Sequence, residues 1–285
     1  MIGRVLGAML VLLAACGTPS NPVEGPAVAS APSVDCPFPE SGFDCDFQRR
    51  FSAAQAYVDG RPGVTALVVR DREQGLLWRN EHSGTMIWTA STIKLAMAAD
   101  LLARDRAEEI TLTPADRAAI GAMLFDSDDK AATTLWMRFS GEDHTVFNKR
   151  FPRIGLISLR PQAGFGRVYP YWGFQKTTAE DLDRLLTHVL AESAPADRAY
   201  LVERMRAVAS NQRWGVWDAG PAARPGAKNG WADEAGGWVM NSIGFVGPAE
   251  RYTVVILNDL RGEGGYDEGR QTTSEAARLL FGGRF

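Results

Sequence analysis

One short pattern in the chain could carry out nucleophilic chemistry. Ser91 and Lys94 form an S-x-x-K pattern in a predicted helix over residues 89–103. Residues three apart share a face of a helix, so the Lys94 amine can reach the Ser91 hydroxyl. A serine hydroxyl needs a neighbouring base to become a nucleophile, and a buried lysine can serve because desolvation lowers its pKa. Alone the pattern is weak, since Ser91 could also be an ordinary residue at a helix N-terminus.

Two later segments place further polar residues in a fixed order. Ser127-Asp128-Asp129-Lys130 is a second S-x-x-K match, but the two acidic residues inside it make a poor base-activated pair. Lys228-Asn229-Gly230 follows much later in the chain. Each segment also has an ordinary structural interpretation, as a helix cap and as a turn. The order of all three segments is more specific than any one of them.

Together the three segments resemble the class A β-lactamases and penicillin-binding proteins. Ser91-Thr92-Ile93-Lys94 and the apolar residues that follow are similar to the nucleophile helix of that superfamily. The stretch from Met123 to Ala132 is similar to its S-D-N segment and the helix that this segment opens. Lys228-Asn229-Gly230 stands where K-T-G lies, at an edge strand before a predicted hairpin over residues 238–258. The resemblance covers roughly residues 46 to 285.

The resemblance implies roles for these residues. Ser91 would be the acylated nucleophile, Lys94 its base or proton relay, and Ser127 the group that passes a proton to the leaving nitrogen. The backbone N–H of Ser91 and a second N–H from the strand after Gly230 would form the oxyanion hole. Lys228 would hold a substrate carboxylate, and no cofactor is implied. The positions implied to bind substrate are Asp129, Lys228, Asn229 and Gly230.

Three departures from the family pattern limit the expected activity. Asp129 replaces an asparagine, and a carboxylate cannot donate the hydrogen bond of an amide. Asn229 replaces a threonine or serine. The class A enzymes carry an E-x-x-L-N loop whose glutamate drives deacylation, but residues 160–173 contain no acidic residue. Efficient penicillin hydrolysis is therefore not expected.

Two functions from different classes remain open. The first is a serine acyl hydrolase of the DD-peptidase type, with weak or no β-lactam hydrolysis and a peptidoglycan-type peptide or β-lactam as ligand. The second is a catalytically inactive β-lactamase-fold lipoprotein that acts as a binding scaffold in the cell envelope. A Ser-His-Asp esterase has little support, because no G-x-S-x-G occurs in the chain.

The N-terminal residues predict export and lipid anchoring. Residues 1–15 have a charged start, an apolar run and small residues before the break, as in a signal peptide. Leu13-Ala14-Ala15-Cys16 resembles a bacterial lipobox, which implies a lipid such as palmitate on Cys16. The alternatives are an ordinary signal peptide or a buried cysteine. Residues 16–35 predict a flexible tether, so the domain would lie at the outer face of the cell membrane.

The cysteines, the histidines and the net charge indicate which ligands and partners can be expected. Cys36 and Cys45 remain after Cys16 is set aside, and in an exported chain we expect them to pair as a disulfide. We expect no metal site, because there is no CxxC or HExxH and the three histidines are scattered. A net charge of −3 gives no basic field for nucleic acid. We expect a monomer.

The distribution of periodic segments predicts an α+β fold. Strand signals occur near both ends of the domain, over residues 64–69, 76–79 and 238–258, and mainly helical signals occur between them. This pattern predicts one antiparallel sheet formed by both ends of the chain, with an inserted helical lobe at about residues 105–208 in a domain of residues 36–285. Aromatic residues before and after the lobe's end could line a groove or belong to the core, namely Tyr169, Tyr171, Trp172, Trp214 and Trp231.

Overall fold

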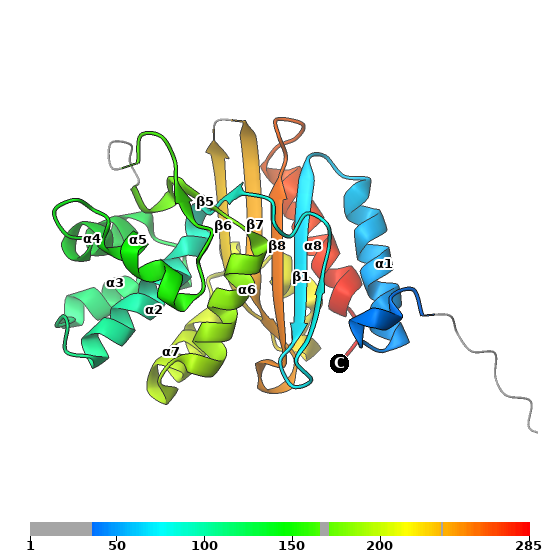
Figure 1. Cartoon of the computed structure of the whole chain (residues 1–285), viewed down its shortest axis with the longest axis horizontal. Helices are drawn as coiled ribbons and strands as arrows, with labels where there is room; N and C mark the ends of the chain where they lie inside the picture. Colours follow the sequence, from blue (N-terminus) through cyan, green and yellow to red (C-terminus); the bar gives the residue numbers. More distant parts are fainter. Residues whose placement is uncertain (1–35, 166–170, 235) are drawn as a thin grey trace, which may run out of the picture. The chain divides into compact units, whose positions relative to one another are not determined.

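The computed structural model describes residues 36–165, 171–234 and 236–285. They form one compact unit, Cys36–Phe285 (Figure 1). The predicted signal peptide, the tether, Cys16 and Tyr169 lie outside the described residues. No described helix is long and apolar enough to cross a bilayer.

A five-stranded antiparallel sheet joins the two ends of the domain. Its strand order is β2-β1-β8-β7-β6, so strands from the start of the domain pair with strands from its end. Val68 of β1 lies opposite Val255 of β8, which in turn lies opposite Ile243 of β7. The predicted α+β fold is confirmed. The strands are β1 (Val64–Asp71), β2 (Leu76–Arg79), β6 (Gly226–Glu234), β7 (Gly237–Val246) and β8 (Tyr252–Asp259).

Both faces of the sheet are covered by helices. Side chains alternate along β1, so Ala66 and Val68 pack on one face while Leu67 and Val69 pack on the other. Helices α1 (Cys45–Asp59) and α8 (Tyr266–Phe281) cover the second face, and the remaining helices lie on the first (Figure 1). This double burial explains why the central strands read as nearly continuous apolar runs rather than as alternating ones.

Side chains cap the first turns of two helices in the helical part of the domain. Thr113 and Asp116 form a capping box at the start of α3, and the Asp128 side chain accepts from Ala131 N at the start of α4. Helix α2 packs in the same core as these helices, ahead of the predicted start of the lobe near residue 105. The helices are α2 (Ile93–Arg106), α3 (Pro114–Phe125), α4 (Asp129–Phe139), α5 (Val146–Arg150), α6 (Ala179–Thr187) and α7 (Pro195–Arg206).

A second sheet has two of its three strands within the region that was predicted to be mainly helical. Its order is β3-β5-β4, with β3 (Ile87–Trp88), β4 (Arg160–Pro161) and β5 (Gln175–Thr177). Strands of two or three residues are too short to show an alternating pattern, so they could not be predicted from periodicity. The short helical turns are η1 (Pro39–Ser41), η2 (Ala90–Thr92), η3 (Phe151–Ile154), η4 (Tyr171–Gly173), η5 (His188–Glu192), η6 (Ser210–Gln212), η7 (Gly215–Ala219), η8 (Pro221–Ala223) and η9 (Pro248–Glu250).

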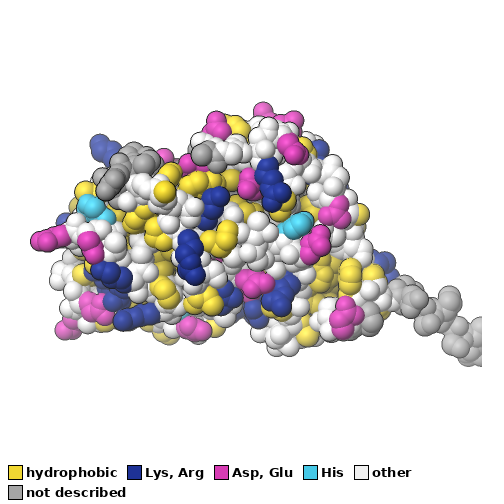
Figure 2. Space-filling view, turned by 45° about the horizontal axis from the view of Figure 1, so that its top comes forward, with side chains coloured by type: hydrophobic (Ala, Val, Ile, Leu, Met, Phe, Trp, Pro, Cys, Tyr) yellow, Lys and Arg dark blue, Asp and Glu magenta, His cyan; other side chains and the backbone are white. Residues whose placement is uncertain are grey.

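Charged side chains of both signs are mixed on the surface. On the face shown in Figure 2, arginine and lysine lie beside aspartate and glutamate, with apolar side chains between them. Elsewhere charged side chains pair directly, such as Arg106 with Asp197 and Arg251 with the buried Asp71. That face has no single basic field of the kind that binds nucleic acid.

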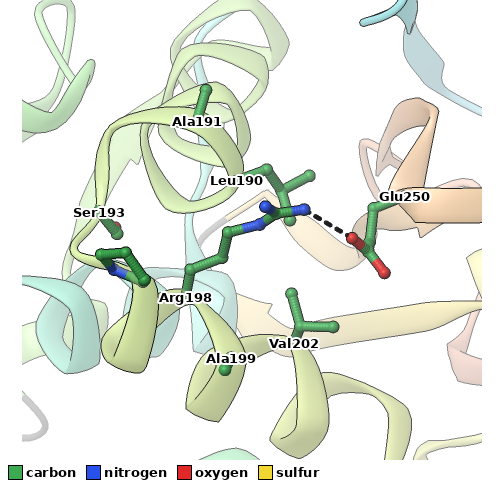
Figure 3. Close-up of a pocket in the computed structure, with 8 residues that line it drawn as sticks. Leu190, Ala191, Ser193, Arg198, Ala199, Val202 and Glu250 are labelled. Atoms are coloured by element: carbon green, nitrogen blue, oxygen red, sulfur yellow. Dashed lines mark hydrogen bonds and ion pairs between the residues drawn. The ribbon is translucent and has the colours of Figure 1, made fainter.

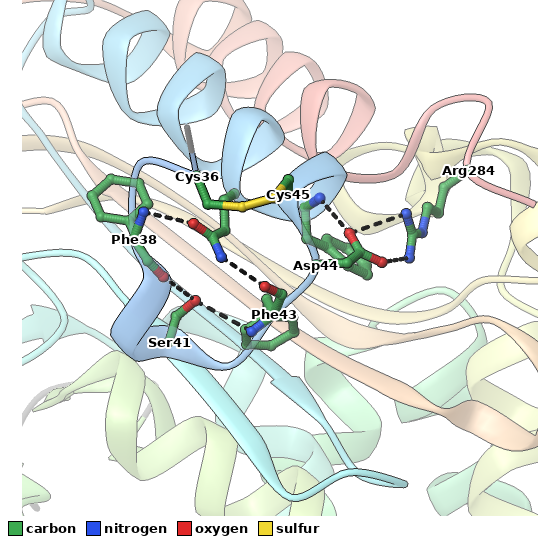
Figure 4. Close-up of a disulfide and its surroundings, with 9 residues drawn as sticks. Cys36, Phe38, Ser41, Phe43, Asp44, Cys45 and Arg284 are labelled. Carbon is green, nitrogen blue, oxygen red and sulfur yellow. Dashed lines mark hydrogen bonds and ion pairs between the residues drawn. A yellow bond between two sulfur atoms is a disulfide. The ribbon is translucent and has the colours of Figure 1, made fainter. Parts of the chain in front are cut away.

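The predicted disulfide is present and secures the N-terminal edge of the domain. Cys36 and Cys45 are joined, with their Cα atoms 5.1 Å apart (Figure 4). Next to it, Arg284 pairs with Asp44 at 2.6 Å and with Asp46 at 2.7 Å. The disulfide therefore ties the residues before α1 to its start, and two ion pairs join this region to Arg284 near the C-terminus.

Replacing Cys45 with serine is expected to lower the free energy of unfolding by roughly 2–3 kcal/mol, because the unfolded chain regains the entropy of a short loop. Urea unfolding of the wild type and of Cys45→Ser, each with and without reductant, would measure this. Reductant should bring the wild type to the level of the variant and leave the variant unchanged. Equal stability of the two oxidised proteins would contradict the prediction.

Candidate active site

Ser91 lies in a tight turn that leads directly into a buried helix. It belongs to η2, immediately before α2, and is 8% exposed. The preceding residue, Ala90, has a φ of +43°, a left-handed conformation that is unfavourable for a residue with a Cβ. Thr92 closes the turn by donating to Thr89 O at 2.6 Å. The backbone strain at Ala90 is thus held by the surrounding structure and directs the Ser91 side chain.

Two strands of the main sheet hold this turn in place. Asn241 of β7 donates through Nδ2 to Trp88 O at 2.8 Å, immediately before η2. Gly230 of β6 lies against the Ser91 backbone so closely that a Cβ there would be 2.7 Å from Ser91 N. The sequence analysis missed Asn241. Its signal in the sequence is the polar pair Asn241-Ser242 inside a mostly apolar strand, and the structure buries Asn241 fully.

Ser127 lies in the short connection between α3 and α4. Its φ is +65°, and the adjacent Asp128 caps α4. Its hydroxyl oxygen accepts hydrogen bonds from two lysines, Lys94 Nζ at 3.2 Å and Lys228 Nζ at 2.9 Å. Residues from three separate parts of the sequence therefore meet at one hydroxyl.

Lys94 is fully buried and donates three hydrogen bonds. Its Nζ donates to Ser127 O at 2.6 Å, to Ser127 Oγ at 3.2 Å and to Asp129 Oδ1 at 2.5 Å. Burial lowers the pKa of Lys94 below its ordinary value, and the neighbouring Asp129 carboxylate partly opposes this effect. Within the described part of the chain, Ser91 Oγ has no hydrogen-bond partner, so this lysine is bonded to Ser127 and Asp129 instead.

Lys228 on β6 is buried almost as deeply, at 2% exposed. Its Nζ donates to Ser127 Oγ and, at 2.7 Å, to Asn229 O. Burial lowers the pKa of Lys228 well below its ordinary value, and the positive charge of Lys94 lowers it further. Two buried amines with lowered pKa values next to one hydroxyl are typical of a site that transfers protons, rather than of a hydrogen-bond network with only a structural role.

The side chain of Asn229 is held by other residues. Its amide nitrogen donates to Gln212 O at 2.8 Å and to Trp214 O at 3.2 Å, and its oxygen accepts from Ser242 at 2.7 Å. These contacts tie β6 to the segment before η7. They also use the amide groups that the sequence comparison assigned to substrate.

Trp172 packs over the Lys94 amine. Its ring centroid is 4.3 Å from Lys94 Nζ, and its indole N–H donates to Thr133 Oγ1 at 3.1 Å. Trp172 is 3% exposed and belongs to η4, in the loop that contains no acidic residue in its sequence. An aromatic face close to an ammonium stabilises its charge. This loop therefore contributes an apolar ring to the site.

Comparison with known proteins agrees with this geometry. No family model matches the chain. It is 30% identical over 260 residues to the protein named "Putative lipoprotein LppW" in Mycobacterium tuberculosis and in Mycobacterium bovis, covering 88% of this chain and 79% of each relative. The chain belongs to the LppW lipoprotein family.

Solved structures show that this LppW-family chain has the class A β-lactamase fold. An ancestral class A β-lactamase superimposes with a TM-score of 0.67 at 20% identity, covering 81% of this chain and 98% of that one. A β-lactamase from Xanthomonas campestris gives a TM-score of 0.70 at 17% identity, covering 83% and 97%. A third, from Burkholderia vietnamiensis, gives 0.68 at 19%, covering 81% and 95%. The protein therefore combines a β-lactamase-like fold with membership of a lipoprotein family.

The aromatic residues considered as a groove belong to different clusters in this LppW-family domain. Trp172 packs in the helical core, whereas Trp214 and Trp231 pack edge to face, with ring centroids 5.9 Å apart, in a cluster with Met240 and Leu260. Phe165 is partly buried and packs edge to face on Trp136 of the core. Trp172 contacts the Lys94 amine through its ring, whereas Trp214 meets the site through its backbone oxygen, which accepts from Asn229.

Other parts of the described chain offer less chemistry. No group of three or more His, Cys, Asp or Glu residues there could hold a metal. A pocket of about 310 Å³ lies beside α7 and the β7–β8 turn, where Arg198 pairs with Glu250 at 2.9 Å (Figure 3). The hydroxyl in its lining, Ser193, donates to His188 O. The cluster around Ser127 remains the better candidate for an active site.

Proposed function

We propose that this protein is an envelope-anchored serine acyl hydrolase of the DD-peptidase type, with little β-lactam hydrolysis. The observation that carries the proposal is the meeting of Lys94 and Lys228 at the Ser127 hydroxyl, beside the strained turn that presents Ser91. The fold alone would not be sufficient, because the same fold can be kept without its chemistry.

The proposed reaction begins at Ser91. Its Oγ attacks the carbonyl carbon of an amide or β-lactam and transfers its proton to the neutral amine of Lys94. The C–N bond breaks, and the leaving nitrogen receives a proton from the Ser127 hydroxyl, which is replenished from Lys94. The Ser91 N–H at the start of α2, with a second N–H from β6 beyond Gly230, stabilises the carbonyl oxygen as it becomes negative.

Slow release of the acyl group follows from the groups around Lys94. No acidic residue occurs in residues 160–173, and the Trp172 ring lies 4.3 Å from Lys94 Nζ. An indole ring cannot take a proton from water. The acyl-enzyme is therefore expected to persist, with peptides or β-lactams as acyl donors.

The membrane attachment is also part of the proposal. Residues 1–15 act as a signal peptide, and Cys16 carries the lipid that holds the domain, residues 36–285, at the outer face of the cell membrane through the tether of residues 16–35. The lipobox in the sequence and the lipoprotein relatives support this arrangement.

A binding scaffold without catalysis is the second candidate. It is favoured by the Lys94–Asp129 ion pair, which keeps the amine protonated and therefore unable to accept a proton from Ser91. Such a protein would bind an envelope ligand reversibly and form no covalent product.

Intact-mass analysis after exposure to a fluorescent penicillin separates the two candidates. We expect the wild type to gain slowly the mass of one covalently bound penicillin, and Ser91→Ala to gain none. Peptide mapping should locate the adduct on Ser91. Absence of any adduct on the wild type, together with no turnover of a thioester or depsipeptide reporter, would exclude the acyl enzyme and favour the scaffold.

A further inference from the structure

Asp129 is the exposed member of an otherwise buried charge cluster. Its side chain is 66% exposed, whereas its partner Lys94 is fully buried. The two are joined at 2.5 Å. A ligand entering the site can therefore reach the Asp129 carboxylate without displacing the lysine from its position.

The Asp129 carboxylate favours the ammonium form of Lys94 in the resting site, against the effect of burial. An ammonium has three N–H donors and no acceptor, and the three are directed to Ser127 O, Ser127 Oγ and Asp129 Oδ1. A protonated lysine cannot take the Ser91 proton. Because burial favours the neutral amine and Asp129 favours the charged one, neutralising this carboxylate would release the base.

The other charges near Lys94 make the entrance negative. Asp129 and Asp128 at the start of α4 and Asp126 at the end of α3 act on Lys94 as negative charges, and Lys228 of β6 is the opposing cation. Lys228 is 2% exposed and bonded to Ser127 and Asn229 O, so its amine is already engaged.

A carboxylate on a substrate would therefore find few partners. The Asn229 amide, the second group that the family pattern assigns to a carboxylate, bonds to Gln212, Trp214 and Ser242. A substrate carboxylate would also meet the negative charge of Asp129. A substrate cation would instead meet the Asp129 carboxylate, which is exposed although its Oδ1 is paired with Lys94.

We propose that Asp129 selects acyl donors that carry a positive charge beside the reacting carbonyl, and that binding of this charge frees Lys94 to act as the base. This inference rests on the proposed acylation of Ser91. In the proposed sequence, the substrate ammonium pairs with Asp129, Lys94 loses its proton to solvent, and the neutral amine then accepts the Ser91 proton as the Oγ–C bond forms. The substrate class is an acyl donor with a lysine-like or other amino side chain.

The test uses three matched reporters, the S-ethyl thioesters of Nα-acetyl-lysine, Nα-acetyl-norleucine and Nα-acetyl-glutamate. Acylation of Ser91 is followed by intact mass across a range of pH in the mature wild type, in Asp129→Asn and in Asp126→Asn. Asp126→Asn is the control, because it removes a neighbouring exposed carboxylate that acts on Lys94 only at a distance. The leaving ethanethiol takes up the proton in each case.

The wild type is expected to react at least about tenfold faster with the lysine reporter than with the glutamate reporter, as a direct charge pair typically gives. Asp129→Asn should lose most of this preference, react roughly tenfold faster with the norleucine reporter at neutral pH, and shift its pH–rate profile to lower pH. Asp126→Asn should stay close to the wild type. A purely structural role for Asp129 would lower all rates together and leave the profile in place.

Two results would overturn the inference and leave the acyl enzyme intact. One is acylation of Ser91 at equal rates by all three reporters in the wild type and Asp129→Asn. The other is labelling by penicillin without any reaction with the lysine reporter. Failure of penicillin and of every reporter would instead remove the proposed function itself.

Discussion

Replacing Lys94 with methionine is expected to lower the rate of Ser91 acylation by roughly 10³-fold, the typical contribution of a positioned general base. Methionine keeps much of the side-chain volume beside Trp172 and removes only the amine. Acylation reactions quenched at a series of times and analysed by intact mass would give the acylation rate. In the wild type, acylation should fall as the pH drops through the lowered pKa of Lys94, because the amine then gains the proton that it must accept from Ser91.

Lys130→Met is the matched control for this change. Lys130 completes the second S-x-x-K pattern but is exposed at the start of α4. Its loss should leave the rate and the pH profile unchanged. Equal losses in the two variants, or a wild-type profile without an acid limb, would show that Lys94 is not the base. Thermal unfolding of both variants would confirm that each is folded.

Gly230→Ala is expected to reduce acylation by at least about 100-fold and stability by about 1–3 kcal/mol, the usual cost of forcing extra atoms into a packed site. The added Cβ would lie 2.7 Å from both Ser91 N and Thr92 N. Strand β6 and turn η2 would have to separate, which would move Ser91 away from Ser127 and distort the proposed oxyanion hole. A displacement of about 1 Å is sufficient for a rate loss of this size.

Gly84→Ala provides the comparison, since a Cβ at Gly84 would meet no atom within 4 Å. The acylation rate and the urea midpoint of both variants should be measured together. Gly84→Ala should behave as the wild type in both measurements. If Gly230→Ala kept wild-type acylation, β6 would not be part of the reacting site.

The fold class of this protein and its disulfide could be predicted from the sequence alone. The strand signals at both ends, the helices between them and the three ordered motifs predicted the α+β fold, which the solved β-lactamases confirm. The two cysteines near the start of the domain predicted the disulfide that is observed. These features depend on local patterns or on counts of residues, so they can be recognised without knowledge of the tertiary structure.

The contacts inside the site were decided only by the tertiary structure. Spacing indicated that Lys94 could reach Ser91, but the folded chain directs its three N–H groups to Ser127 and Asp129. The sequence also could not indicate that Trp172 would pack on this amine.

The contacts of two asparagines were also decided only by the tertiary structure. Asn229 bonds to the segment before η7, and Asn241 holds the turn that contains Ser91. Each contact joins residues far apart in the chain. Its geometry depends on how the sheet and helices pack, so it is set by the whole core rather than by any local pattern.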